Sequence, residues 1–83
     1  FFNGLSEAGQ TISDAQKQAA RLADGPTFAH GITKRQLHIE WNMSVEDAIT
    51  IEAEAQAICM QTQDFQRAYD AFVAKHKPVF QGD

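Results

Sequence analysis

The stretch SVEDAITIEAEAQAICMQTQDFQRAYDAFVAKHKP, residues 44–78, decides the fold of this 83-residue chain. Its second half places mostly apolar side chains at i, i+3, i+4, i+7, i+8 and i+11: Phe65, Ala68, Tyr69, Phe72, Val73 and His76. Because this spacing follows the turn of an α-helix, it predicts an amphipathic helix over residues 63–76 that Pro78 terminates. Thr62 or Asp64 is expected to cap its N-terminus.

The first half of the same stretch predicts a longer helix over residues 44–62. Ser44 followed three residues later by Asp47 resembles a capping box, with Asp in place of the usual Glu or Gln. Small and branched apolar residues form a narrow stripe along it, which suits close packing against another helix: Ala48, Ile51, Ala55 and Ile58.

Two further helices are predicted toward the N-terminus, over residues 13–24 and 26–41. Ser13 is the expected cap of the first helix, and Pro26 suits the first position of the second. Gly31 is expected to let another helix approach closely. Since no stretch alternates like a strand, the predicted fold class is all-α, with about four helices in one domain.

The composition limits the classes of partner. The chain has 7 Lys and Arg against 11 Asp and Glu, a formal net charge of −4, whereas phosphate binding to nucleic acid needs clustered cations. No apolar run is long enough to span a membrane. A single cysteine, Cys59, cannot form an internal disulfide. These features predict a soluble, cytoplasmic protein with no nucleic-acid or membrane partner.

No catalytic or metal site is predicted from the residues themselves. His30 and His38 lie two helical turns apart, about 12 Å at 1.5 Å per residue, which is too far for one ion. Cys59 has no adjacent basic residue to activate its thiol. The carboxylates Glu46, Asp47, Glu52 and Glu54 are expected to form a solvated helix start. Lys75, His76 and Lys77 could meet a phosphate, but a solvated helix end is the simpler interpretation.

Three stretches nevertheless resemble one known family. They are LADGPTFAHGITKR (residues 22–35), SVEDAITIEAEAQAICMQTQDF (44–65) and AYDAFVAKHKPVFQGD (68–83). In order and spacing they are similar to the C-terminal end of enoyl-CoA hydratases/isomerases, the crotonase superfamily. Residues 1–5 also resemble the Tyr/Phe-Asn-x-Leu stretch that precedes these helices in the family.

The resemblance implies that residues 1–83 are the C-terminal helical region, which serves as a lid and in assembly, of an enzyme acting on acyl-CoA thioesters. The family's catalytic core, with its oxyanion hole and acid/base Glu residues, would be absent from these residues. No catalytic residue is therefore expected here. Coenzyme A would be present only as part of the substrate of the parent enzyme, a hydratase or isomerase of fatty-acid or related acyl-CoA metabolism.

The same resemblance implies two binding residues. In the family, the Phe and Lys of a Phe-x-x-Lys stretch can reach the nucleotide end of CoA bound to a neighbouring subunit, and Phe72 and Lys75 occupy those positions. Three residues apart, they are expected on one face of the last helix. Periodicity alone would also suit Phe72 to a core. The chain departs from the family at Arg67-Ala68, where Glu-Gly is usual, and at His76, where Arg is usual.

Three hypotheses follow about the protein as a whole. Because the chain begins at Phe1 rather than Met, we expect a fragment or processed product, and an open reading frame upstream would favour the enzyme region. The alternatives are a stand-alone helical interaction module without catalytic activity and a small nucleic-acid-binding protein. The excess of apolar residues predicts self-association, most simply as a dimer, through Phe28, Ile32, Leu37, Trp41, Phe65 and Phe72.

Overall fold

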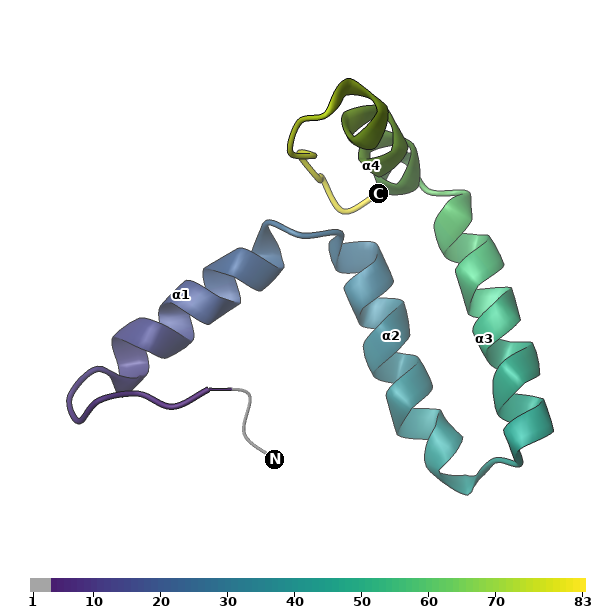
Figure 1. Ribbon diagram of the computed structural model, residues 1–83. Helices are drawn as coiled ribbons and strands as arrows, with labels where there is room; N and C mark the ends of the chain where they lie inside the picture. Colours follow the sequence, from purple (N-terminus) through teal and green to yellow (C-terminus); the bar gives the residue numbers. More distant parts are fainter. Residues whose placement is uncertain (1–3) are drawn as a thin grey trace.

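The computed structural model describes residues 4–83, and their regular structure is entirely helical, which confirms the predicted all-α fold class. The helices are α1 (Thr11–Ala23), α2 (Thr27–Ile39), α3 (Val45–Met60) and α4 (Gln63–Ala74), with a 3₁₀ turn, η1 (Glu40–Asn42), after α2. Figure 1 shows α2 and α3 side by side, α1 splayed away from them, and the C-terminal tail looping back beside α4. Of residues 1–5, for which a resemblance to the family is noted, residues 1–3 lie outside the described residues.

Side-chain caps fix the starts of α3 and α4. The Ser44 hydroxyl accepts a hydrogen bond from the Asp47 N–H at 3.1 Å, as the capping-box pattern predicts. At α4 the Thr62 hydroxyl accepts from the Phe65 N–H at 3.1 Å. Of the two candidate caps of α4, Thr62 is therefore the residue that acts, and Asp64 is free for another role.

The start of α1 differs from the prediction that Ser13 caps it. The helix begins at Thr11, and Gln10 precedes it without a side-chain cap, so Ser13 lies inside the first turn. The physical reason is a turn just upstream, in which Gly9 adopts a positive φ of 85° and the Gln10 N–H bonds the Glu7 carbonyl at 3.0 Å. This turn reverses the direction of the chain, so the helix begins two residues earlier than predicted.

The second helix also corrects two expectations. Pro26 precedes α2 as its N-cap, and the helix proper begins at Thr27. A Cβ built on Gly31 would meet nothing within 4 Å, so no other helix of the described residues packs closely on it. The predicted end at Trp41 is close, because α2 stops at Ile39 and tightens into η1.

The end of α4 is set by a left-handed residue and comes before Pro78. The helix stops at Ala74, and Lys75 has φ 60° and ψ 42°. The next N–H, of His76, bonds back to the Ala71 carbonyl at 2.9 Å, which is the pattern of a Schellman turn. The predicted extension to His76 is therefore wrong by two residues, because the chain reverses at Lys75.

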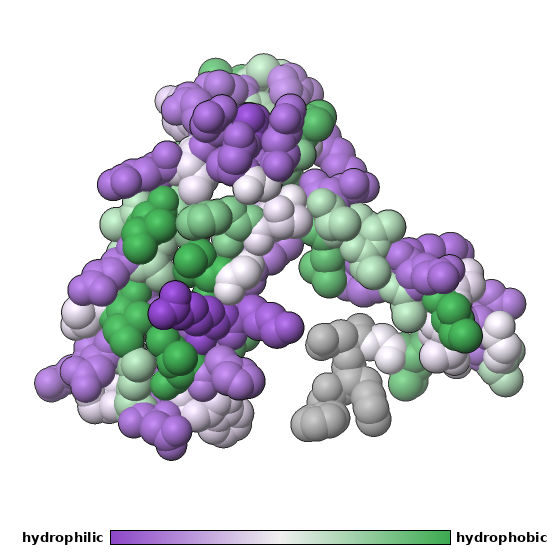
Figure 2. Space-filling view, turned by 180° about the vertical axis from the view of Figure 1, so that it is seen from behind, coloured by the Kyte–Doolittle hydropathy of each residue, from purple (hydrophilic) through white to green (hydrophobic). Residues whose placement is uncertain are grey.

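The described residues have almost no hydrophobic core of their own. Ala71 is their only buried apolar residue. The radius of gyration is 16.0 Å, where about 12 Å is expected for a globular domain of this length. The accessible surface is 7267 Å², against about 4,900 Å² for a globular monomer of this mass. Figure 2 shows hydrophobic side chains gathered over the α2–α3 pair and α1 standing apart from it.

Candidate functional site

The two residues implied to bind CoA lie at the C-terminal end of α4. Phe72 is 81% exposed, so it is no part of a core within this chain. Lys75 is exposed and follows the helix in the left-handed conformation. The expectation that both lie on one helical face is therefore wrong, since the three-residue helical spacing does not extend through a left-handed residue. They instead flank the turn that ends α4.

The backbone at Lys75 is costly for its residue type. A left-handed residue with a Cβ is less stable than glycine there by about 1 kcal/mol. Lys77 and His76 follow directly, and the His76 Nδ1 lies 3.0 Å from the Lys77 carbonyl oxygen. Among the described residues, neither Lys75 nor Lys77 forms an ion pair. The turn therefore presents two unpaired ammonium groups beside an exposed aromatic ring, a combination that suits a phosphate-bearing aromatic ligand.

The apolar stripe predicted along α4 is mostly uncovered. Four of its members form one face that we call the α4 apolar face: Phe65, Tyr69, Phe72 and Val73. Their exposed fractions run from 43% for Phe65 to 81% for Phe72. The covered face of α4 instead carries Asp64 and Ala71, seven residues or two turns apart. The stripe is available to a partner, while the neighbouring face receives the tail.

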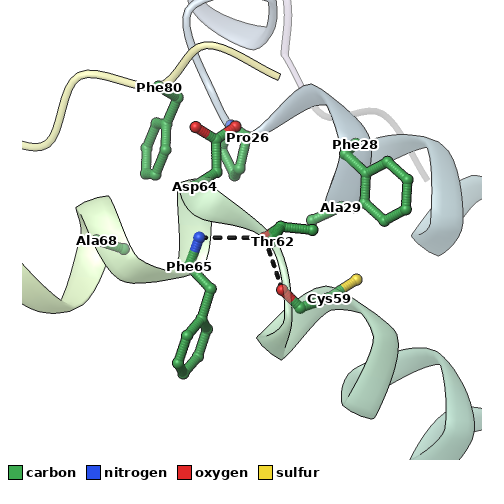
Figure 3. A pocket seen from close by; sticks show the side chains of 9 residues that line it. All are labelled: Pro26, Phe28, Ala29, Cys59, Thr62, Asp64, Phe65, Ala68 and Phe80. Carbon is green, nitrogen blue, oxygen red and sulfur yellow. Dashed lines mark hydrogen bonds between the residues drawn. The ribbon is translucent and has the colours of Figure 1, made fainter. Parts of the chain in front are cut away.

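A small hollow lies where α2, α3, α4 and the tail meet (Figure 3). Its volume is about 160 Å³, and its lining is mainly apolar: Pro26, Phe28, Ala29, Cys59, Thr62, Asp64, Phe65, Ala68 and Phe80. Phe80 enters it from the tail, as expected for an apolar tail residue, whereas Val79 stays 75% exposed. Cys59 is half-buried in this wall and forms no disulfide. The tail thus contacts the helices through the residues that line this hollow.

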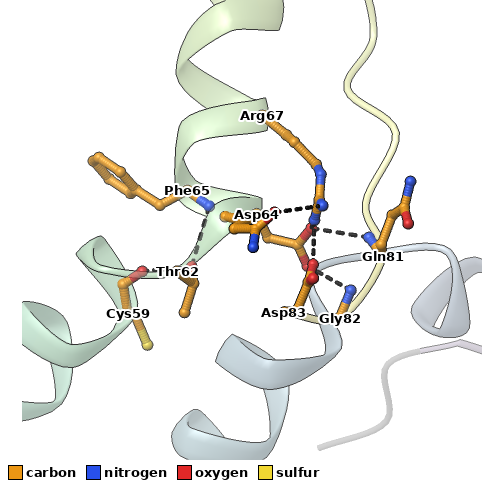
Figure 4. A network of polar contacts seen from close by, with 9 residues as sticks. Cys59, Thr62, Asp64, Phe65, Arg67, Gln81, Gly82 and Asp83 are labelled. Carbon is orange, nitrogen blue, oxygen red and sulfur yellow. Dashed lines mark hydrogen bonds and ion pairs between the residues drawn. The ribbon is translucent and has the colours of Figure 1, made fainter.

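A polar clasp, which sequence reasoning missed, closes the tail onto α4 (Figure 4). Asp64 is only 2% exposed, and its two carboxylate oxygens accept from the Gln81 N–H at 2.9 Å and the Gly82 N–H at 2.8 Å. The Asp64 N–H in turn donates to the Asp83 carbonyl at 2.6 Å. Arg67 donates to Asp64 at 2.6 Å and also to the Asp83 carboxylate. We call this set of five residues the tail clasp.

The hydrogen bonds and charges within the tail clasp favour the charged forms of Asp64 and Arg67. Burial acts to raise the pKa of Asp64, but the N–H donors of Gln81 and Gly82 and the Arg67 guanidinium outweigh it and hold that pKa below its usual value. Hydrogen bonds to Asp83 and Asp64 raise the pKa of Arg67. Arg67 thus has a structural role at one of the positions where the sequence departs from the family pattern.

A second pair of acids, Glu40 of η1 and Glu52 of α3, lies at one end of the α2–α3 pair. A hydrogen bond with Glu52, together with partial burial and charge repulsion, raises the pKa of Glu40. Glu40 Oε1 is buried without a hydrogen-bond partner, and so is Nε2 of Gln36, a residue only 6% exposed. Glu46, Asp47, Glu52 and Glu54 are all exposed, as expected for a solvated helix start, although Glu52 also faces Glu40.

Other sites are not found in the part of the chain that the structure describes. Within residues 4–83, no three His, Cys, Asp or Glu side chains gather where they could hold a metal ion. His30 and His38 are both exposed. No helix among these residues has the length and apolar character needed to cross a membrane.

Comparison with known proteins gives a consistent set of relatives, although no family model matches the chain. It is 30% identical over 74 residues to the 1,2-epoxyphenylacetyl-CoA isomerase of Escherichia coli strain K12, an alignment that covers 88% of this chain and 28% of that protein. A protein assigned as an enoyl-CoA hydratase, from Streptomyces coelicolor A3(2), has a matching solved structure with a TM-score of 0.94 and 36% identity, over 99% of this chain and 30% of that one.

A second solved structure matches this chain in the same way as the first. A protein assigned as an enoyl-CoA hydratase/isomerase, from Mycobacterium abscessus, matches with a TM-score of 0.87 and 37% identity, over 90% of this chain and 29% of that one. The chain therefore spans less than a third of the length of each of these relatives. In each case most of this chain is matched, so its extended helical arrangement is one that longer proteins also contain.

Proposed function

We propose, from the premise that this chain belongs to the enoyl-CoA hydratase/isomerase (crotonase) superfamily and matches its C-terminal helical region, that it mediates oligomerisation and covers the CoA pocket of an acyl-CoA enzyme. Residues 1–83 would then be the lid and assembly region of a protein whose catalytic core is formed by other residues. The name of each of the three relatives includes a CoA thioester, which supports an acyl-CoA as the substrate class.

The observation that carries this proposal is the apolar surface that the chain leaves without a partner. Large hydrophobic side chains are exposed on all four helices, among them Leu22, Leu37, Ile49 and Phe72. Contiguous apolar patches larger than a few hundred Å² usually mark an interface. A helical layer of this kind is stable when it packs against a catalytic core and against neighbouring subunits, so it supports assembly as the role.

The end of α4 supports the contact with CoA. The exposed ring of Phe72 can stack on an adenine, and the unpaired ammonium groups of Lys75 and Lys77 can attract phosphates. The strained backbone at Lys75 adds to this argument, because strained residues concentrate at functional sites. Fatty-acid or related acyl-CoA metabolism in the cytoplasm is the setting we propose for the whole enzyme.

Two measurements test the proposal. Sedimentation velocity of the 83-residue chain at high micromolar concentration is expected to show self-association, most simply a dimer, and a well-folded monomer would contradict the assembly role. Titration with coenzyme A is expected to shift the NMR signals of Phe72 and Lys75. Self-association without CoA binding would favour the stand-alone interaction module instead. The chain alone is expected to show no turnover of crotonyl-CoA, since we place no catalytic residue in it.

A further inference from the structure

The tail after α4 is fixed at two points and is irregular between them. The first point is the left-handed turn at Lys75, where the His76 N–H bonds the Ala71 carbonyl. The second is Asp64, which accepts the N–H groups of Gln81 and Gly82. Residues 77–80 have no regular secondary structure. Their position therefore depends on both anchors, and Lys77 lies in the span between them.

At the second anchor, Asp64 binds the tail through both its side chain and its backbone. The Asp64 carboxylate takes two successive backbone N–H groups, while its own N–H donates to the Asp83 carbonyl. Arg67 bridges the carboxylates of Asp64 and Asp83. Charge-assisted hydrogen bonds of this kind are stronger than neutral ones. The second anchor therefore concentrates several strong contacts on only three tail residues.

The anchor also sets the tail against α2. Gly82 has a φ of 84°, and a Cβ there would lie 2.6 Å from the Thr27 hydroxyl oxygen. Any larger residue would both strain this backbone and collide with the first residue of α2. The tail is thus held between α4 and the start of α2, with Phe80 in the hollow beneath it (Figures 3 and 4).

We infer that Asp64 is a positioning residue, which clamps Gln81 and Gly82 so that Lys77, in the span between the two anchors, is held ready beside Lys75 for the phosphate groups of coenzyme A. The inference rests on the proposed CoA contact and adds the device that orients it. A segment pinned at both ends has less conformational entropy to lose when it binds a ligand. Asp64 itself is buried under the tail and would not touch CoA.

The test compares Asp64→Asn with Asp70→Asn, the same change on an exposed carboxylate of α4 that accepts only from Gln66. Two quantities are measured in the 83-residue chain: hydrogen exchange of the Gln81 and Gly82 amides, and affinity for coenzyme A and for adenosine. Adenosine keeps the base that would stack on Phe72 but carries no phosphate. We expect Asp64→Asn to speed exchange and to weaken CoA binding about tenfold through lost preorganisation, with adenosine affinity unchanged. Asp70→Asn should change neither.

Each other outcome is decisive. Unchanged exchange in Asp64→Asn, or faster exchange with unchanged CoA affinity, overturns the inference and leaves the proposed function standing. Equal losses for CoA and adenosine indicate a merely structural role and also overturn it. Failure of the unaltered chain to bind CoA overturns the proposed contact and the inference with it, while the exchange data still report on the clasp. If Asp64→Asn does not fold, Gly82→Ala releases the tail without altering α4, and the same pattern is expected.

Discussion

Two carboxyl groups of this protein, Asp64 in the tail clasp and Glu40 at the start of η1, lose solvent on folding, but their pKa values shift in opposite directions. Asp64 is surrounded by N–H donors and a guanidinium, and its pKa is lowered. Glu40 faces another carboxyl group, keeps one oxygen without a partner, and its pKa is raised. Burial disfavours the charged form of both carboxyl groups, so the neighbouring groups decide whether the pKa is lowered or raised.

The largest expected effect comes from removing the charge of Asp64. Because its folded-state pKa lies below the ordinary value, the clasp stabilises the chain fully above about pH 4 and loses this contribution as the pH falls further. Asp64→Asn should therefore lower the unfolding temperature clearly at pH 7, and the gap to the unaltered chain should close in acid. Thermal unfolding followed by circular dichroism measures both. A gap that stays constant down to pH 2 would contradict this account.

The opposite sign is expected at Glu40. Its folded-state pKa lies above the ordinary value, so its contribution to stability is complete below about pH 4 and is lost as the pH rises through the folded-state pKa. Glu40→Gln keeps a donor for Glu52 and removes the repulsion, so it should stabilise the chain at pH 7 and not at pH 4. Glu54→Gln, on the exposed surface of α3, is the matched control. A destabilising Glu40→Gln at pH 7 would show that Glu40 has an unrecognised donor.

Among the helix caps, the same substitution should have opposite effects at two serines. Ser44→Ala removes the cap of α3 and should cost about 1 kcal/mol. Ser13→Ala lies inside α1 and should stabilise it by a few tenths, about 0.3–0.5 kcal/mol, through higher helix propensity. Urea unfolding of both variants checks the pair. Equal losses would mean that Ser13 is a cap after all.

An effect between those of the two serine variants should come from relaxing the turn at Lys75. Lys75→Gly removes the left-handed strain and should stabilise the chain by about 0.5–1 kcal/mol. It should also weaken CoA binding, because it removes an ammonium group. Urea unfolding together with CoA titration measures both. Lys17→Gly, on exposed α1, is a contrasting control that should destabilise the chain, since Gly is unfavourable inside a helix.

Local patterns predicted the elements well and their ends less well. The order of four helices, the caps Ser44 and Thr62, and the resemblance to the crotonase superfamily are all confirmed. Ser13 and the end of α4 were wrong because turns at Gly9 and Lys75 redirect the chain locally. A left-handed lysine leaves no pattern in the sequence, since glycine or asparagine is the usual residue there.

The candidate site was predictable only as far as the resemblance reached. Phe72 and Lys75 follow from it, and they stay predictions. The tail clasp could not be predicted from the sequence, because Asp64 and Gly82 lie 18 positions apart and Asp64 was interpreted as a candidate helix cap. Contacts of that range leave no periodic signal in a single sequence. Arg67 stands out in the sequence only as a departure from the family pattern, and its partner Asp83 emerges only in three dimensions.

The sequence by itself determined the helices, because helix formation depends on spacing and caps within a few residues. Tertiary structure alone decided which apolar faces are covered, because that depends on how the helices lie relative to one another. It left the α4 apolar face open and closed the face that carries Asp64 and Ala71 under the tail. It also decided the opposite directions in which the pKa values of Asp64 and Glu40 shift, since a pKa depends on groups brought close from distant positions.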